Sequence, residues 1–426
     1  PFIRESQTRC VSDTARGGVG DRSLIYRYYL YRVTTSAGFY LPVSVLVLQD
    51  KGFGLGFIGF AYAVYALGTL LSEIPTGYLG DRLGRRASLA LGCGLRVLVV
   101  GLYPFLETAG AYLVIHVVWA AGRSFRSGTQ DAWLYEILES RFDASAFANV
   151  ESRGRMARLV VSAGGAIAGS LLYGLDPAWP FLVNAGLATL GLPLLATFPV
   201  VEESDDSDAA ERFAVGDALR LLRAQARRPT VRWFVVYAAL FHALFLVTRI
   251  YEQPAFDEIG VPVAGFGLIY AGFKLASAGA ASTVGWLQDT FGIRGVFALL
   301  IPLYGLAYAG LLVVPALVIP VLFLNRGLST VTAPLRNQYL NDRLENVGRA
   351  TVLSGAAMAM ALVGGVARVV AALAADGLGA VALLGYAGLV IAPAGAILWV
   401  ASSPVRTVDE ANGNTRTEGA STVTTD

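Results

Sequence analysis

The chain has 426 residues, of which 55% are hydrophobic and only 15% are charged, and its formal net charge is +2. Soluble domains carry roughly 25% charged residues, so this composition, with a mean hydropathy of +0.57, indicates a protein whose solvent is largely lipid. The small net charge excludes a basic nucleic-acid-binding face. The two cysteines have no companions that would complete a disulfide framework or a metal site.

The hydropathy pattern predicts an all-α integral membrane protein. Backbone groups in hydrocarbon must be satisfied within each helix, so a spanning segment takes the form of an apolar run of about 20 residues. Twelve such runs predict twelve transmembrane helices in two six-helix bundles, 22–200 and 231–401. The predicted spans are 24–48, 54–76, 87–105, 110–137, 153–173 and 179–200, then 231–253, 263–285, 294–314, 316–340, 349–374 and 380–401.

Three polar segments flank or separate the predicted bundles. Residues 1–21 are a polar N-terminal tail without the apolar core of a cleavable signal, so we expect the chain to be retained whole. Residues 201–230 are a cytoplasmic linker in which an acidic stretch precedes an amphipathic helix over 213–228, with a flexible tether as the alternative. Residues 402–426 have no apolar period and are predicted to be disordered.

The distribution of basic residues predicts the orientation in the membrane. Arginines gather in the connections on one side of the predicted spans, whereas the connections on the other side offer only Lys51. Short loops rich in arginine face the cytoplasm. We therefore expect a multi-pass, monomeric protein of the plasma membrane with both termini in the cytoplasm.

The most specific motif, Glu73-Ile-Pro-Thr-Gly-Tyr-Leu-Gly-Asp-Arg-Leu-Gly-Arg-Arg86, follows the second predicted span, and a degenerate copy recurs 208 positions later. A tight turn between antiparallel helices needs residues that tolerate positive φ, which Gly77, Gly80 and Gly84 supply. Asp81 is placed to cap the next helix or to pair with an arginine. The equivalent positions are Gly77, Leu79, Asp81, Gly84 and Arg86 in the first copy, and Gly285, Leu287, Asp289, Gly292 and Arg294 in the second.

The spacing Gly-x-x-x-Asp-x-x-Gly-x-Arg in a short loop after a second spanning helix resembles the signature of the major facilitator superfamily of secondary transporters. The resemblance implies two six-helix halves related by an axis along the membrane normal, with alternating access around a central site. The segments 73–77, 127–136 and 349–354 look like a group of prokaryotic members often described as permeases or putative drug exporters. The resemblance therefore implies a secondary active transporter of a small organic solute, proton-coupled, and an exporter more than an importer.

The signature segment is also predicted to be a conformational latch. Asp81 placed against Arg349, or against an arginine of the fourth span, would hold the cytoplasmic ends of the two halves together. The arginines of the segment would keep it in the headgroup region. The predicted latch residues are Gly77, Asp81, Arg82, Gly84, Arg85, Arg86, Asp289, Arg294 and Arg349.

Ionisable residues inside the predicted spans are functional candidates, because a charge in hydrocarbon costs several kcal/mol unless it is paired or faces water. On the fourth span, Arg123, Ser127 and Asp131 recur every four residues and share one stripe, with Arg126 on the adjoining stripe. Drug antiporters of the family that the chain resembles carry a proton-coupling arginine on this helix, which implies that role for Arg123 or Arg126. The alternative is a buried ion pair that locks this span to its neighbours.

Two carboxylates are the predicted proton carriers. Glu73 lies one turn before the signature loop and next to Pro75, where a desolvated carboxylate would suit a proton carrier. The alternative is a structural pairing of Glu73 with an arginine. Asp131 is the rival carrier, and Glu136 is a third candidate nearer the membrane interface.

Three mid-span cations predict a cationic lining for a central cavity. Lys274 lies near the middle of the eighth span, and together with Arg96 and Arg326 it would attract an anionic group on the substrate. A competing interpretation pairs Lys274 with Glu252 or Asp131. We therefore expect an anionic or zwitterionic substrate rather than a lipophilic cation.

Histidine and aromatic side chains complete the predicted site. His242, near the middle of the seventh span, would serve as a proton relay or, as the alternative, as a packing residue beside Phe241 and Phe245. Tyr270 is one of several tyrosines that would give the cavity an aromatic wall. The predicted substrate-binding residues are Arg96, Lys274, Arg326, His242 and Tyr270.

Nothing in the sequence points to an enzyme or to ATP hydrolysis. No Gly-x-x-x-x-Gly-Lys-Ser/Thr segment and no Ser/His/Asp constellation stands out, so we expect an ion gradient as the energy source, with no metal and no other cofactor. The expected partners are a small-molecule substrate and the lipid bilayer. Two alternatives remain: a transporter-fold receptor or structural membrane protein without transport, and a facilitative or anion-uptake permease.

Overall fold

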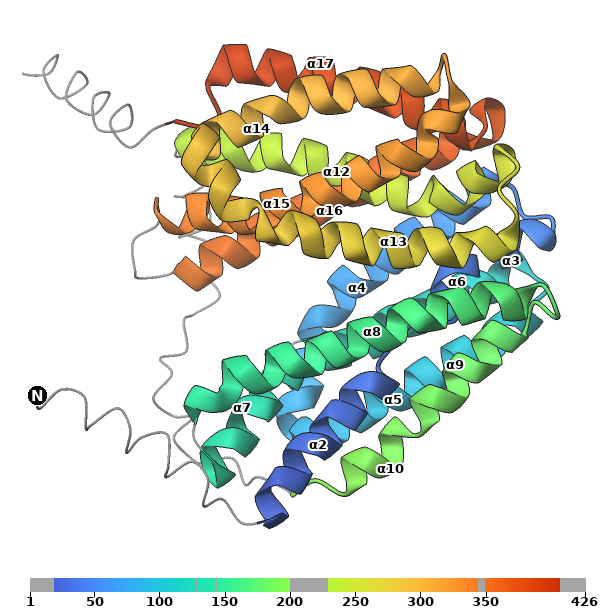
Figure 1. Ribbon diagram of the computed structural model, residues 1–426, viewed down its shortest axis with the longest axis vertical. Helices are drawn as coiled ribbons and strands as arrows, with labels where there is room; N and C mark the ends of the chain where they lie inside the picture. Colours follow the sequence, from blue (N-terminus) through green and yellow to red (C-terminus); the bar gives the residue numbers. More distant parts are fainter. Residues whose placement is uncertain (1–18, 128, 143, 200–228, 344–348, 407–426) are drawn as a thin grey trace, which may run out of the picture.

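The computed structural model describes residues 19–127, 129–142, 144–199, 229–343 and 349–406 (Figure 1). Every regular element within these ranges is a helix, as the predicted all-α class requires. The predicted amphipathic helix at 213–228, nearly all of the linker and most of the two tails lie outside the described residues.

The helices form two bundles that follow one another along the chain (Figure 1). The first contains α2 (Val19–Thr34), η2 (Leu41–Val43), α3 (Leu46–Asp50), α4 (Leu55–Leu83), α5 (Arg85–Leu102), η3 (Tyr103–Phe105), α6 (Ala109–Ser127), α7 (Thr129–Arg141), η4 (Ala144–Ala146), α8 (Phe147–Tyr173), α9 (Trp179–Thr189) and α10 (Gly191–Ala196). The second contains α12 (Pro229–Glu258), α13 (Val263–Ser282), α14 (Val284–Leu311), η6 (Pro315–Leu317), α15 (Val318–Asn341), α16 (Arg349–Leu378) and α17 (Ala380–Ser402).

The first predicted span, 24–48, is interrupted rather than continuous. It is divided into α2, η2 and α3. At the end of α2 the hydroxyls of Thr34 and Thr35 donate to the backbone oxygens of Tyr31 (2.8 Å) and Arg32 (2.7 Å). These bonds satisfy carbonyls of the last turn of α2, and the chain turns there although the hydropathy pattern alone predicts one helix.

The fourth predicted span, 110–137, is also divided. Helix α6 ends at Ser127 and α7 begins at Thr129, so the predicted stripe through Arg123 and Asp131 does not lie on one continuous helix. Ten helices among the described residues are long and apolar enough to cross a membrane. The two divided segments account for the difference from the twelve predicted spans.

The signature segment is helical for most of its length, which corrects the predicted loop. Helix α4 continues to Leu83, and both Gly77 and Gly80 lie within it. Of the three signature glycines, Gly84 alone has a positive φ, of +77°, between α4 and α5. Gly292, its counterpart in the second copy, has a φ of +63° at a kink inside α14. Because this backbone region favours glycine, the two equivalent positions share one local conformation.

The two bundles pack together where α8 meets α13 and where α4 meets α16 (Figure 1). Small residues let these helices approach closely. A Cβ on Gly267 of α13 would lie 2.3 Å from the carbonyl oxygen of Ala166 in α8, and a Cβ on Gly59 of α4 would lie 2.9 Å from the Cβ of Ala372 in α16. The absence of a side chain at these two glycines therefore permits the close packing of the two bundles.

Hydrogen bonds join the bundles near their predicted outer ends. The side chain of Gln253 in α12 accepts from the backbone N–H of Val45 and donates to the carbonyl of Leu41, both at 2.8 Å. Asp376 of α16 accepts from the N–H of Gly56 at 2.8 Å. Figure 1 shows the bundles converging toward these ends, on the right of the view, and diverging toward α7 on the left. The structure is therefore closed on the predicted outer side.

Candidate functional site

A cavity of about 660 Å³ lies between the two bundles. One wall comes from α4, α5, α6, α8 and the break after α2, and the other comes from α12, α13, α15 and α16. The single carboxylate among the lining residues is that of Glu252. Seven arginines line the cavity: Arg96, Arg123, Arg126, Arg158, Arg249, Arg336 and Arg368. Cavities of this size hold small organic ligands. The space for a ligand is therefore surrounded by positively charged side chains.

The cavity arginines are short of hydrogen-bond acceptors. Arg96 donates to the backbone oxygen of Ser36. A buried donor without an acceptor costs free energy, and a carboxylate or phosphate oxygen would satisfy it with a charge-assisted hydrogen bond. Four of the arginines have a buried Nε atom with no hydrogen-bond partner among the described residues: Arg126, Arg158, Arg336 and Arg368.

Glu252 is held in a buried ionic network. Its Oε2 accepts a hydrogen bond from the Arg326 guanidinium at 2.6 Å, and its Oε1 accepts one from the Tyr270 hydroxyl. The Arg326 guanidinium also lies over the ring of Phe273, 4.7 Å from the ring centre. The carboxylate of the cavity wall is thus already neutralised by an arginine that is not among the seven, and their positive charge remains in surplus.

The next residue, Gln253, connects this network to the first bundle. Its Nε2 donates to the Tyr270 hydroxyl at 2.9 Å, and the same side chain bonds the backbone of η2 and α3. A continuous series of polar contacts therefore runs from Arg326 in α15, through Glu252 and Tyr270, to the broken first span. A change of charge at Glu252 would act on the contact between the bundles at their predicted outer ends.

Three of the five predicted substrate-binding residues line the cavity, namely Arg96, His242 and Tyr270. The other two, Lys274 and Arg326, are not among its lining residues. Lys274 is half-buried on α13. The competing interpretation that pairs Lys274 with Glu252 is not what the structure shows, because that carboxylate is bonded to Arg326 and Tyr270.

The predicted proton-coupling residues fall into two groups. Arg123 and Arg126 of α6 line the cavity. Glu73 of α4 and Asp131 of α7 have exposed side chains and are not among its lining residues. The assignment of proton coupling to these four residues stays a prediction.

Two signature arginines contact other helices of the first bundle. The Nε of Arg85 donates to Glu136 of α7 at 3.0 Å. Arg86 donates to the carbonyl oxygens of Ala196 (2.6 Å) and Phe198 (3.1 Å), at the end of α10. Cations are stabilised by the free carbonyls at a helix C-terminus. These bonds fix the start of α5 against α7 and α10.

The described positions of the remaining predicted latch residues do not test the latch. Arg82, Asp289 and Arg294 have exposed side chains. The side chains of Asp81 and Arg349 lie outside the described part of the chain. The latch between the two halves therefore stays a prediction.

The predicted site residues do not include most of the cations that line the cavity. A sequence signal for one wall was present on α12. His242, Phe245, Arg249 and Glu252 follow one another at intervals of three or four residues, and all four line the cavity. A polar stripe of this kind on an apolar helix is visible in the sequence alone. Arg249, Glu252, Arg336 and Arg368 are ionisable residues of predicted spans to which the sequence assigned no specific role, and Arg158 was expected in a cytoplasmic connection.

Comparisons with known sequences agree with this architecture. Residues 32–351 match the family model of the Major Facilitator Superfamily. The chain is also 24% identical over 253 residues to YxaM of Bacillus subtilis (strain 168), an uncharacterized MFS-type transporter. That match covers 58% of this chain and 62% of the relative's length.

Solved transporter structures share the fold. A mutant of the nucleoside transporter NupG has a TM-score of 0.72 at 12% identity, with 90% of this chain and 99% of that chain covered. A bacterial homologue of the iron transporter ferroportin in the inward-facing state has a TM-score of 0.68 at 14% identity, with 90% and 98% covered. A D-xylose–proton symporter has a TM-score of 0.60 at 13% identity, with 89% and 96% covered. These similarities establish a common architecture.

Proposed function

This chain belongs to the Major Facilitator Superfamily, and we propose that it is a secondary transporter that moves a small organic anion across the membrane by alternating access. Family membership makes it a multi-pass membrane transporter and not an enzyme. The observation that supports an anionic substrate is the charge of the cavity. Among the described residues, seven arginines line it, and the one carboxylate of the lining is already paired with Arg326.

The surplus of positive charge favours anions over cations by a large margin. Two unit charges 4 Å apart interact by about 4 kcal/mol at an effective dielectric constant of 20. A single direct contact with an arginine therefore separates an anion from a cation of the same shape by several kcal/mol. Lipophilic cations would meet repulsion from both walls of the cavity.

We propose export as the direction of transport. An inside-negative membrane potential contributes about 2.3 kcal/mol per charge per 100 mV, and it drives anions outward. The three segments that look like those of the drug-exporter group support the same direction. A structure closed on the predicted outer side corresponds to the state that receives a substrate from the cytoplasm.

Proton coupling is part of the proposal. In an exporter that exchanges protons for substrate, proton binding must weaken substrate binding, and Glu73 and Asp131 are the predicted carriers. Neither side chain lines the cavity, so the competition between proton and substrate would have to act through the helices α4 and α7 that carry them. We further propose that the protein works as a monomer in the plasma membrane, with both termini in the cytoplasm and without a cofactor.

One observation favours a second candidate function, proton–anion symport into the cell. Protonation of Glu252 would remove the negative charge that this residue places in the cavity wall, so the cavity would attract an anion more strongly. A proton and an anion would then strengthen each other's binding. Positive linkage of this kind is the property of a symporter, whereas an exchanger needs competition.

Ligand binding to the purified protein tests the substrate class. A panel of organic anions, zwitterions and cations would be screened by thermal stabilisation, since a ligand at 100 times its Kd stabilises by about 2.7 kcal/mol. We expect anions to stabilise the protein and Arg249→Gln to weaken their binding at least tenfold. Arg232→Gln changes an exposed arginine of the same helix, outside the cavity lining, and should have no effect. Stabilisation by cations alone would contradict the proposal.

Imposed gradients in proteoliposomes separate the two directions of coupling. For a proton–anion symporter, an acidic exterior should drive anion uptake without a membrane potential. For an exchanger, an acidic interior should drive the same uptake. Glu252→Gln imitates the protonated carboxyl group, and anion transport that no longer responds to a pH gradient in this variant would assign the proton to Glu252.

A further inference from the structure

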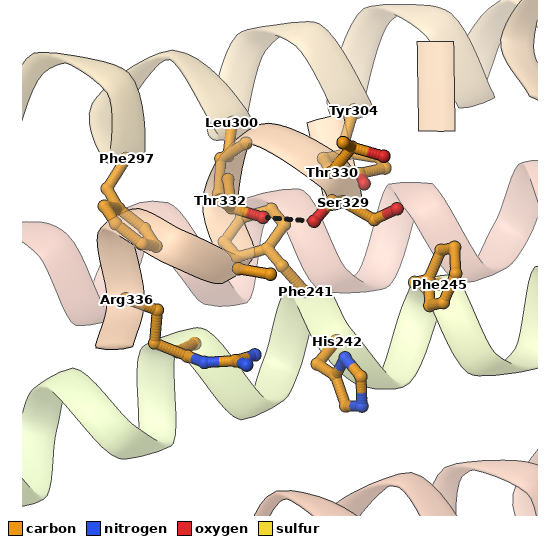
Figure 2. Close-up of a pocket in the computed structure, with 12 residues that line it drawn as sticks. Phe241, His242, Phe245, Phe297, Leu300, Tyr304, Ser329, Thr330, Thr332 and Arg336 are labelled. Carbon is orange, nitrogen blue, oxygen red and sulfur yellow. Dashed lines mark hydrogen bonds between the residues drawn. The ribbon is translucent and has the colours of Figure 1, made fainter. Parts of the chain in front are cut away.

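A second cavity, of about 280 Å³, lies inside the second bundle and is shown in Figure 2. It lies beside the main cavity between the bundles. Helices α12, α14 and α15 form its walls. His242, Phe245 and Arg336 line both cavities, so the two spaces meet at these side chains. In Figure 2, Arg336 and His242 lie on one side of this side pocket, and Leu300 and Tyr304 lie on the opposite side.

The walls of the side pocket are mostly aromatic and apolar. The rings of Phe241 and Tyr304 lie 5.5 Å apart, and His242 stacks on Phe245 with an interplanar angle of 28°. Flat aromatic surfaces favour a ligand that is itself a flat ring. The apolar and aromatic lining residues are Ala238, Phe241, Phe245, Phe297, Leu300, Tyr304 and Ala333.

The hydroxyl groups of the pocket do not supply donors to a ligand. Ser329, Thr330 and Thr332 each donate to a backbone oxygen of their own helix, at 2.8 to 3.0 Å. Tyr304 donates to the side chain of Asn325 at 3.0 Å. Each hydroxyl hydrogen is therefore already used. The positive charge among the lining residues comes from Arg336, whose buried Nε has no hydrogen-bond partner in the described part of the chain.

We propose that the side pocket binds the planar ring of an aryl anion whose carboxylate, sulfonate or phosphate group lies against Arg336 and the arginines of the main cavity. The inference rests on the proposed anion transport and narrows its substrate class. An apolar cavity of about 150 Å³ already holds benzene, so 280 Å³ leaves room for one ring or two fused rings. A flexible alkyl chain would lose more rotational freedom in the same space than a rigid ring loses.

Equilibrium binding to the purified full-length chain in detergent tests this assignment with three probes. 2-Naphthoate carries both the ring and the charge, acetate carries the charge alone, and 2-naphthalenemethanol carries the ring alone. We expect wild-type protein to bind 2-naphthoate at least tenfold more tightly than either of the others. Arg336→Gln should weaken binding of 2-naphthoate at least tenfold and leave that of the neutral alcohol unchanged.

Filling the pocket tests where the ring lies. Ala333→Phe should reduce the preference for 2-naphthoate over acetate to twofold or less, while acetate binding stays unchanged. Val236→Phe adds a ring at an exposed position of α12 outside the pocket lining and should change neither. If Ala333→Phe does not yield monodisperse protein, Ala238→Leu fills the pocket from α12 and must give the same result.

The outcomes separate the side pocket from the proposed function. Equal binding of 2-naphthoate and acetate by wild-type protein, or a ring preference that survives pocket filling, overturns the side pocket and leaves anion transport standing. Failure of wild-type protein to bind 2-naphthoate overturns the side pocket as well. Arginine substitutions in the main cavity that leave both anions unaffected would instead overturn the proposed anion transport.

Discussion

The buried ion pair between Glu252 and Arg326 allows a quantitative test of the site. The two charges are 2.6 Å apart, and their side chains are 2% and 9% exposed. Glu252→Gln keeps the shape of the side chain and an acceptor for Tyr270, but it leaves the Arg326 charge without a partner. Breaking a buried pair in this way costs about 3–5 kcal/mol. Because Glu252 borders the cavity, where water can relieve part of the charge, we expect a loss near 3 kcal/mol.

A second ion pair of the same protein provides the matched control. Arg85 and Glu136 are bonded at 3.0 Å, but their side chains are 35% and 26% exposed. Exposed pairs contribute only about 0.2–1 kcal/mol, so Glu136→Gln should cost less than about 1 kcal/mol. Unfolding in mixed micelles with an increasing fraction of denaturing detergent, followed by tryptophan fluorescence, would measure the loss of unfolding free energy in both variants under the same conditions.

The double variant completes the measurement. Glu252→Gln together with Arg326→Gln removes both charges and should recover most of the loss, which would appear as a coupling energy of about 2–3 kcal/mol in a double-mutant cycle. The reasoning fails if Glu252→Gln costs no more than Glu136→Gln. It also fails if the double variant is less stable than either single variant.

Gly84→Ala and Gly292→Ala should each lower the free energy of unfolding by about 1–2 kcal/mol, because a Cβ is strained at positive φ. Gly77→Ala lies inside α4 with open space around it and should be neutral or stabilising. Thermal unfolding midpoints would compare the three variants. Gln253→Ala should loosen the outer contact between the bundles, so distances between spin labels at the outer ends should lengthen; an unchanged distribution would exclude a closing role. Arg368→Gln should raise the melting temperature of the ligand-free protein and weaken anion binding, whereas a lower melting temperature would indicate a structural role.

The membrane class and the duplication could be predicted because they depend on composition and spacing alone. Gly84 and Gly292 show why spacing sufficed: Gly84 supplies a positive φ between α4 and α5, and Gly292 supplies one at the kink inside α14, so the same local requirement calls for glycine in both copies. The extent of α4 could not be predicted in the same way. Gly77 and Gly80 are compatible with a turn and also with a helix, and only the positions of neighbouring helices decide between the two.

The cavity lining was harder to predict because depth along a helix does not fix the face that a residue occupies. Arg326 lies near the middle of its span as predicted. Its partner Glu252, however, comes from another helix, 74 residues away in the sequence. The break after α2 depends likewise on tertiary contacts, since the backbone N–H of Val45 is satisfied by Gln253 of the other bundle. A single sequence without these contacts could not reveal either arrangement.

The arrangement of the arginines explains how an anion would change the balance between the bundles. Arg96, Arg123, Arg126 and Arg158 belong to the first bundle, and Arg249, Arg336 and Arg368 belong to the second. Like charges on facing walls repel, so in the empty cavity they favour separation of the bundles on the side away from the Gln253 contact. An anion between the walls attracts both at once and reverses the sign of that interaction. Substrate binding would therefore favour closure of the predicted cytoplasmic side, which is the step that alternating access requires.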